Sequence, residues 1–375
     1  MIAYFHQDTW DDLNLEICNA GKLDHVRKVM LDKMPFVDRI SVALYDTETD
    51  YLRTYAYSSE QDSPLNHYQA KLAKCKSLLE IKQTRKSRVV QNLALFKNSE
   101  HKHTKAIYKS GFQSSYTFPM FWRGELFGFI FFNSTQAEAF GEELLPSLDT
   151  ISHLIAFFVH NEIHEVKTLS ATVKSALQLT HIRDPETGAH LERMSHYSRL
   201  IASKIAPKYG FSDYFIEYIG LFAPLHDLGK LAIPDSVLLK QGSLNEEEFS
   251  TMKQHSVMGK KLVDHLIENF QLQGLEHIEV LRNLVLSHHE MMDGSGYPEG
   301  LSGDEIPIEA RIITVADIFD ALTSKRPYKE AWSIDEAFAE MEELAKSKLD
   351  PDCVAALINN REQVEEIKNT FLDEG

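Results

Sequence analysis

The chain has 375 residues, 43% hydrophobic and 25% charged, a composition typical of a folded globular protein with room for two domains. Its formal net charge of −17 argues against a DNA, RNA or anionic membrane surface, because such surfaces need an excess of Lys and Arg. The three cysteines are scattered without a CxxC pair, and no apolar run reaches the roughly 18 residues of a membrane span. Together with an N-terminus that lacks a signal peptide pattern, these features predict a cytoplasmic protein.

The first 160 residues alternate between helical and β-type patterns. Apolar residues at helical spacing predict a helix over 11–34, which ends before Pro35. The remaining patterns predict strands over 40–45 and 51–57, a helix over 65–83, and strands over 114–121 and 128–133 joined by a polar turn. This order predicts an α+β domain in which helices pack on an antiparallel sheet.

Residues 10–160 resemble a GAF domain, the small-molecule sensor fold. The resemblance rests on the segments 111–115, 118–120 and 124–128 and on the helical pattern after Phe140. It implies a GAF-like sensor domain over residues 1–147, for which a small ligand is possible but not identified by the sequence. Cys75, His101 and His103 could indicate haem or a metal, but we expect these side chains to be exposed on the surface.

A long helix without Gly or Pro is predicted over residues 148–180. Its apolar residues recur at three- and four-residue steps, from Leu148 to Ala176. The step from Phe158 to Ile163 breaks the heptad phase, which changes the supercoil locally without ending a helix. We interpret this segment as a linker helix that forms a coiled coil in a homodimer. The alternative is a helix packed on its own two domains.

After residues 183–186 the patterns are helical almost to the C-terminus, which predicts an all-α domain over 181–375. This domain contains most of the chain's candidate metal ligands: Glu186, His190, His226, Asp227, His255, His288, His289 and Asp317.

Eight ligands are too many for one ion. Residues four apart, such as Glu186 and His190, share a helix face, whereas adjacent residues diverge by roughly 100° on a helix. An adjacent pair can therefore serve two different ions or bracket one. Imidazole and carboxylate ligands without thiolate favour iron, manganese or another borderline divalent ion.

Residues 180–360 resemble an HD-GYP domain, a subclass of the HD phosphohydrolases. The matching segments are 183–190, 225–230, 233–235, 252–255, 288–290, 293–298 and 316–329. The resemblance implies metal-dependent hydrolysis of the bacterial second messenger cyclic di-GMP to linear pGpG, GMP or both. Small departures from the family pattern at Ser256 and at residues 241–242 and 291–292 remove no ligand. Glu at position 186 accompanies a third metal ion in this family, so we expect a trinuclear rather than a dinuclear centre.

The resemblance also implies roles for individual residues. Asp227 is expected to bridge two ions about 3.5–4 Å apart, which would acidify a shared water. Lys230 follows by one turn and is expected to offset charge on the phosphate or the leaving oxygen, the alternative being a surface salt bridge. Tyr297, Arg326 and Lys329 are expected to contact the substrate.

Two further expectations concern the surroundings of the ligands. Asp320 is expected to orient a metal ligand from the second shell. The glycine-rich loop 293–298 could border the substrate cleft or be a purely structural turn.

Three functional hypotheses remain from the sequence. The first is a dimeric cyclic di-GMP phosphodiesterase that the GAF-like domain regulates through the linker helix. The second is a catalytically weak module that binds cyclic di-GMP or docks a partner protein, with a structural metal site. The third is a phosphohydrolase whose substrate is another nucleotide. The presence of Tyr297, Arg326 and Lys329 argues against this hypothesis.

Overall fold

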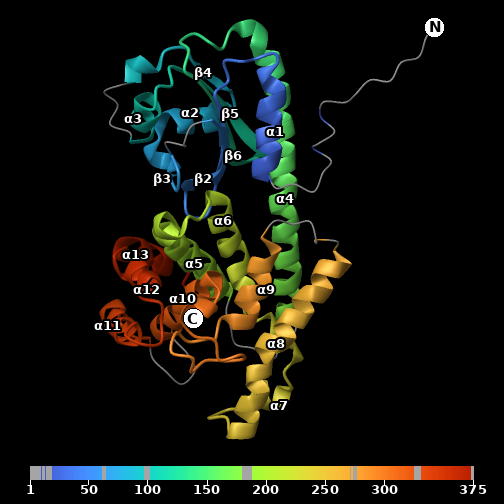
Figure 1. The fold of residues 1–375 in the computed structure, drawn as a ribbon, viewed down its shortest axis with the longest axis vertical. Helices are drawn as coiled ribbons and strands as arrows, with labels where there is room; N and C mark the ends of the chain where they lie inside the picture. The colour runs from blue at the N-terminus through green and yellow to red at the C-terminus, as the bar shows by residue number, and fades with distance from the viewer. Residues whose placement is uncertain are drawn as a thin grey trace, which may run out of the picture. The chain divides into compact units, whose positions relative to one another are not determined.

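The computed structural model describes residues 10, 13, 19–60, 65–96, 102–179, 188–270, 272, 277–324 and 331–372 (Figure 1). The chain divides into two compact units, Met1–His164 and Glu165–Gly375. Within the described ranges, none of the helices combines the length and the apolar character that a membrane crossing requires.

The first unit contains a six-stranded sheet with the order β3-β2-β1-β6-β5-β4. All neighbouring strands are antiparallel. The strands are β1 (Arg39–Tyr45), β2 (Tyr51–Ser59), β3 (Gln69–Lys71), β4 (Arg88–Val90), β5 (Ser114–Trp122) and β6 (Glu125–Ser134). The two predicted hairpins are confirmed. Arg123 and Gly124 connect β5 to β6, and both have positive φ, 48° and 92°, as a tight two-residue hairpin turn requires.

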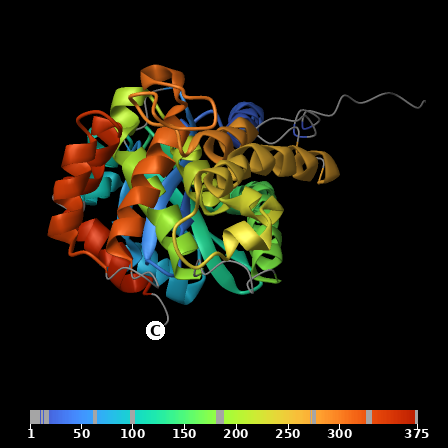
Figure 2. The ribbon, with the colours of Figure 1, turned by 90° about the horizontal axis from the view of Figure 1, so that it is seen from below.

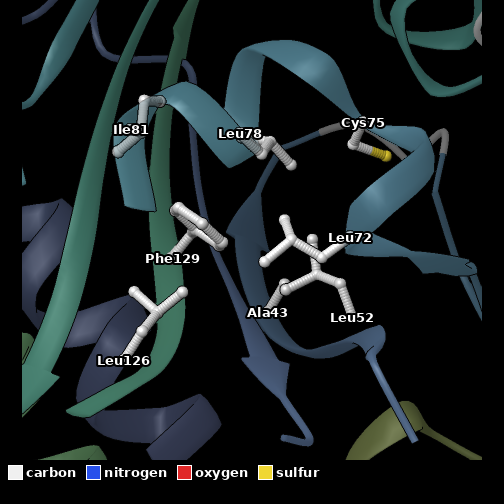
Figure 3. Close-up of a cluster of buried hydrophobic side chains, with 8 residues drawn as sticks. All are labelled: Ala43, Leu52, Leu72, Cys75, Leu78, Ile81, Leu126 and Phe129. Atoms are coloured by element: carbon white, nitrogen blue, oxygen red, sulfur yellow. The ribbon is translucent and has the colours of Figure 1, made fainter. Parts of the chain in front are cut away.

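Helices pack on both faces of this sheet. On one face, α1 (Asn19–Leu31) packs against β2. The first part of α4 (Leu145–Leu179) lies along β5, where the His153 ring meets Phe118 edge-on at 4.9 Å. On the other face, α2 (Lys76–Thr84) directs Leu78 and Ile81 toward Phe129 (Figure 3). The remaining helix of this unit is α3 (Lys102–Lys109). The α+β antiparallel fold class is confirmed.

Two expectations for the first unit are corrected, and two of its elements were not predicted. Residues 69–71 form the edge strand β3, because they pair with residues 51–53 of β2, and regular α-helix begins only at Lys76. Strand β4 and helix α3 were not predicted. Cys75 is buried, with 4% of its surface exposed, because it belongs to the hydrophobic cluster that contains Leu72 and Leu78. His101 and the side chain of His103 lie outside the described residues.

The second unit is helical throughout its described residues, as predicted, apart from one isolated bridge between Asp293 and Ser302 (Figures 1 and 2). Its helices are α5 (Gly188–Tyr209), α6 (Asp213–Phe222), α7 (Asp235–Leu238), α8 (Glu246–Asn269), α9 (Ile278–Ser287), α10 (Ile308–Thr323), α11 (Ile334–Leu344), α12 (Pro351–Ile358) and α13 (Arg361–Thr370). The short 3-10 helices η5 (Ala223–Leu225) and η6 (Leu228–Ala232) lie between α6 and α7.

Local signals fix several helix starts in this unit. The Asn245 side chain accepts from the Glu248 backbone, and the Glu248 side chain accepts from the Asn245 backbone, which forms a capping box at the start of α8. Ser212 caps α6 by a single contact, in which its hydroxyl oxygen accepts from Phe215 N at 3.0 Å. Helix α5 packs on α6, α10 and α12, so it lies at the core of the unit.

The long helix expected over 148–180 is present as α4, and the division between the two units falls inside it. Its role as a dimerising coiled coil stays a prediction.

Candidate metal centre

Five elements of the second unit bring seven of the eight predicted metal ligands together. Helix α5 carries His190, the junction of η5 and η6 carries His226 and Asp227, α8 carries His255, the end of α9 carries His288 and His289, and α10 carries Asp317. Glu186, the eighth, lies outside the described residues. The cluster depends on tertiary packing, since α8 packs against both η6 and α9, and α10 packs against α5 and α9.

The seven residues form two neighbouring groups of donor atoms. One group contains Asp227, His255, His288 and His289, and the other contains His190, His226 and Asp317. In each group the ligand atoms lie within 4.8 Å of one another. Each group combines imidazole with a carboxylate and contains no thiolate, a donor set that suits divalent iron, manganese or zinc.

The two pairs of adjacent ligands differ in how they are divided between the donor groups. His226 belongs to one donor group and Asp227 to the other, as expected for neighbours whose side chains diverge. His288 and His289 belong to the same group, and their ring centroids are 4.1 Å apart. Helix α9 ends at Ser287, so His289 lies beyond the helix and is not held to helical divergence.

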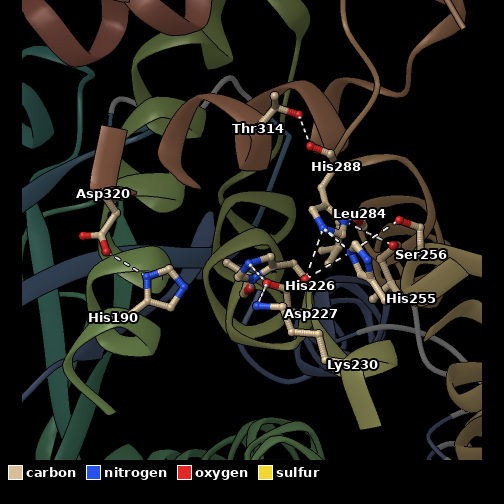
Figure 4. A network of polar contacts seen from close by, with 12 residues as sticks. His190, His226, Asp227, Lys230, His255, Ser256, Leu284, His288, Thr314 and Asp320 are labelled. Atoms are coloured by element: carbon tan, nitrogen blue, oxygen red, sulfur yellow. Dashed lines mark hydrogen bonds and ion pairs between the residues drawn. The ribbon is translucent and has the colours of Figure 1, made fainter. Parts of the chain in front are cut away.

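Asp227 lies between the histidines of both groups (Figure 4). Its Oδ1 is 3.2 Å from Nε2 of His255, and its Oδ2 is 3.2 Å from Nε2 of His226. Nζ of Lys230 lies 2.9 Å from the same Oδ2. One carboxylate therefore presents one oxygen to each donor group.

Four histidines are oriented by contacts made through Nδ1. His226 contacts the carbonyl of Ala223 at 2.9 Å and His255 that of Met252 at 2.8 Å. His288 contacts the carbonyls of Leu284 and Val285, and His190 contacts the carboxylate of Asp320. Because these oxygens can only accept, Nδ1 carries the proton in each histidine, and Nε2 keeps the lone pair that a metal ligand needs.

Two imidazoles of this site, those of His288 and His289, are held in the neutral form. Burial lowers the pKa of His288, and it lowers the pKa of His289, where the neighbouring His288 adds to the effect. Nε2 of His255 and Nε2 of His288 are 3.4 Å apart. With Nδ1 protonated in both rings, two lone pairs face each other, an arrangement that a cation between them would stabilise. The residues present therefore fit a metal centre.

The electrostatics of Asp227 favour its ionised form. Burial by itself would raise the pKa of this carboxyl, but opposing interactions, of which the positive charge of Lys230 is the largest, hold the pKa well below its usual range. Asp227 is therefore an anion throughout the neutral pH range, as a bridging ligand must be.

Asp320 supports the centre without belonging to either donor group. Its Oδ2 lies 2.7 Å from Nδ1 of His190, so the orienting contact expected for this residue is present. The sequence reading missed Arg193, which lies one turn after His190 on α5. Arg193 donates to both oxygens of Asp320 at 2.5 and 3.0 Å, and to the carbonyl of Phe371 at 2.9 Å. The i,i+3 spacing of His190 and Arg193 on a helix was the signal that could have identified it.

The loop after His289 is tied closely to the site. The Tyr297 ring lies over the His289 ring, with centroids 4.6 Å apart and planes at 31°. Tyr297 N donates to the carbonyl of His289 at 3.2 Å. A Cβ at Gly296 would lie 2.4 Å from the backbone nitrogen of Met291, so only glycine allows this approach. Burial raises the pKa of Tyr297, and the phenol stays protonated at neutral pH.

Glu290 is a second residue that the sequence reading left without a role. Its side chain is buried, and Oε1 accepts from the backbone nitrogens of Glu299 and Gly300 at 2.7 and 3.1 Å. Oε2 accepts from Leu301 N at 3.0 Å. The carboxylate therefore fixes the chain that follows Tyr297. Arg326 and Lys329, the expected phosphate contacts, lie outside the described residues.

Residues 182–353 match the protein-family model described as "HD domain". A curated relative from Xanthomonas campestris pv. campestris, "Cyclic di-GMP phosphodiesterase response regulator RpfG", is 44% identical over 60% of this chain and 56% of its own length. The "3'3'-cGAMP-specific phosphodiesterase 3" of Vibrio cholerae is 38% identical over 50% of this chain and 38% of its own.

Among solved structures, "the GAF domain/HD domain protein from Geobacter sulfurreducens" overlaps 37% of this chain and 93% of its own, with 16% identity and a TM-score of 0.30. The chain matches 56% of the length of the Xanthomonas relative and 38% of the length of the Vibrio relative, which is about half or less of each. Residues 182–353 of this chain are therefore similar to the HD domain family, and the curated relatives are named phosphodiesterases, which agrees with the predicted resemblance to the HD phosphohydrolases.

Proposed function

We propose that this chain is a metal-dependent phosphodiesterase that hydrolyses cyclic di-GMP to linear pGpG, GMP or both. The observation that carries the proposal is the position of Asp227, with one oxygen toward His255 and the other toward His226. The name of the Xanthomonas relative supports the choice of cyclic di-GMP.

The ligands of the proposed centre are Glu186, His190, His226, Asp227, His255, His288, His289 and Asp317. When bound there, divalent ions would polarise a phosphoryl oxygen and lower the pKa of water. We assign iron or manganese to the centre, and we assign Glu186 as a ligand of a third ion. The mixed imidazole and carboxylate donors support this assignment.

Lys230, Tyr297, Arg326 and Lys329 act on the substrate in this proposal. The Lys230 ammonium lies beside Asp227 and offsets charge that develops on the phosphate or the leaving oxygen. The protonated Tyr297 hydroxyl is a hydrogen-bond donor at the edge of the centre. Arg326 and Lys329 supply the positive charge that a cyclic dinucleotide requires in a chain with a net charge of −17.

The N-terminal unit is proposed to regulate hydrolysis through α4. Helix α4 leaves the sensor unit and continues to Leu179, and the ligand His190 lies near the start of the next described helix. A homodimer formed along α4 would place two such helices side by side. Sedimentation of the intact protein tests this part, and a monomer at all concentrations would contradict it.

Hydrolysis is tested by loading the purified protein anaerobically with Fe(II) or Mn(II), adding cyclic di-GMP and separating the products by chromatography. We expect pGpG or GMP from the wild type and none from Asp227→Asn. Metal analysis of the same sample should give close to three ions per chain. Two ions per chain would remove the role given to Glu186, and intact substrate under these conditions would overturn the proposed function.

A second candidate substrate is 3'3'-cGAMP, because a relative that matches half of this chain is named for it. The two substrates differ in one base, so the centre described above serves both. A competition assay with equal concentrations of the two separates these candidates by the ratio of their kcat/KM values. A protein that binds either nucleotide without turnover would instead be the signalling module of the alternative hypothesis.

A further inference from the structure

Helix α8 carries an exposed aromatic residue and a lysine beside the candidate metal centre. Phe249 is 46% exposed, although its side chain is large and apolar. Lys253 follows it by four residues, so the two side chains lie on the same face of α8. Nζ of Lys253 lies 4.8 Å from the centroid of the Phe249 ring. The proposed hydrolysis gives neither residue a role.

Tyr297 connects this pair with the metal ligands. Its ring centroid is 6.4 Å from that of Phe249, with the two planes at 81°, and 5.5 Å from Nζ of Lys253. The same ring centroid lies 4.6 Å from the His289 ring and 6.3 Å from the His255 ring. Phe249 and Lys253 therefore lie one aromatic ring away from two candidate metal ligands.

The ammonium of Lys253 is available to a ligand. Among the residues that the structure describes, no carboxylate forms an ion pair with Lys253, whereas Lys230 lies 2.9 Å from Asp227. The contact of an exposed ammonium with an aromatic ring is weak, and the lysine stem is flexible. Lys253 can therefore exchange its ring contacts for hydrogen bonds. Because an ammonium only donates, the ligand atoms that it selects are acceptors.

A purine base has the chemistry that this pair fits. Bases stack on aromatic side chains, and the exposed ring of Phe249 offers such a surface. A ribose separates the base of a nucleotide from its phosphate, so a phosphate at the metal ligands leaves the base at the rim of the site. Guanine presents two acceptors, O6 and N7, whereas adenine presents the N7 acceptor beside the N6 donor. The ammonium of Lys253 therefore favours guanine.

We propose that Phe249 and Lys253 bind one guanine base of the substrate, Phe249 by stacking and Lys253 by donating to O6 and N7. This inference rests on the proposed phosphodiesterase function and names the residues that select the base. Cyclic di-GMP and 3'3'-cGAMP each contain a guanine, so both can occupy the site. A cyclic dinucleotide with two adenines cannot make the O6 contact, and its kcat/KM should be at least about tenfold lower.

The test is isothermal titration calorimetry of the full-length, Mn(II)-loaded protein with GMP, AMP and inosine monophosphate. These nucleotides contain no phosphodiester, so binding is measured without hydrolysis. Inosine monophosphate keeps O6 and N7 of guanine and lacks its amino group. We expect it to bind like GMP, and AMP to bind at least about tenfold more weakly. Equal affinity for all three nucleotides would overturn the proposal, as would inosine monophosphate that binds as weakly as AMP, or no heat from GMP.

Lys253→Met removes the donor and keeps an unbranched side chain on α8. Its affinity for GMP should fall by about tenfold, to that for AMP, while its affinity for AMP stays near that of the wild type. Lys261→Met, at an exposed position of the same helix, is the control. A preference for GMP that survives in Lys253→Met would overturn the role of Lys253. An equal loss for GMP and AMP would overturn it too, because Lys253 would then contact the phosphate.

Phe249→Leu should weaken the binding of GMP and AMP alike, by about fivefold or more, because every base can stack. Phe270→Leu is the matched control, since Phe270 lies at the end of α8 and is also 46% exposed. Circular dichroism and metal analysis check that each variant is folded and loaded. Wild-type affinity in Phe249→Leu would contradict the stacking role. Intact cyclic di-GMP in the hydrolysis assay would overturn the proposed function and leave these binding results unchanged.

Discussion

Asp320 contacts Nδ1 of the metal-ligand candidate His190 at 2.7 Å, although it belongs to neither donor group itself. The same carboxylate is fixed by Arg193, which also contacts the carbonyl of Phe371 beyond α13. The His190 and Arg193 contacts outweigh burial and lower the pKa of Asp320, so the carboxylate is ionised at neutral pH. The orientation of His190 therefore depends on a chain of contacts that reaches the last described helix.

Replacing Asp320 with Asn should lower metal affinity by about 10- to 100-fold, because an amide holds His190 less firmly and makes it a weaker ligand. Metal content after dialysis against graded chelator measures the effect. Asp304→Asn is the control, since its side chain is 98% exposed. Unchanged metal affinity in Asp320→Asn would show that His190 does not depend on this contact.

Lys230→Gln should lower kcat by about 10²- to 10³-fold while the metal content stays near that of the wild type. The ammonium is placed to stabilise charge in the transition state, and it is not a metal ligand. Steady-state kinetics and metal analysis on one preparation check both parts. Lys261→Gln, on the exposed side of α8, should leave both unchanged. A variant that loses its metal and its activity together would assign Lys230 a structural role.

Glu290→Gln should reduce the free energy of unfolding by about 1.5–3 kcal/mol and raise KM. The amide NH2 of Gln cannot accept from Leu301 N, so one of the three backbone contacts is lost and the chain after Tyr297 is less fixed. Chemical denaturation and substrate titration measure the two effects. Glu299→Gln, at an exposed position of the same loop, serves as the comparison. Wild-type stability in Glu290→Gln would contradict the role given to the carboxylate.

Removing metal should lower the melting temperature of the protein. The facing Nε2 atoms of His255 and His288, 3.4 Å apart, lose the cation between them, and the stabilisation by binding is lost as well. A ligand present at 100 times its Kd contributes about 2.7 kcal/mol. Thermal melts with EDTA, and then with Mn(II) added back, test this expectation. His255→Leu should show a smaller difference in melting temperature between the two conditions than the wild type, because it lacks one ligand of this group. Identical melts of the wild type would argue against a metal at this group.

The sequence predicted the helical unit, and seven of the candidate ligands lie in two donor groups. It treated the two adjacent pairs alike, as neighbours that diverge on a helix and can serve two ions or bracket one. The structure separates His226 from Asp227 but groups His288 with His289, because α9 ends at Ser287. Arg193 and Glu290 were missed as partners, since their contacts join positions that only the folded chain brings together.

The first unit was harder to predict for a related reason. Strands β3 and β4 have three residues each, too few for a periodic pattern to indicate them. Burial of Cys75 depends on a cluster that includes residues from distant strands, such as Ala43 and Phe129.

The three contacts of Glu290 have a consequence for hydrogen exchange. The amides of Glu299, Gly300 and Leu301 lie in a loop, where amide protons normally exchange with solvent within seconds to minutes. Each of these amides donates to a buried carboxylate, so exchange requires the loop to leave Glu290 and expose its charge. Their protection factors should approach those of the neighbouring helices. We therefore expect the segment after Tyr297 to stay in place rather than to open and close.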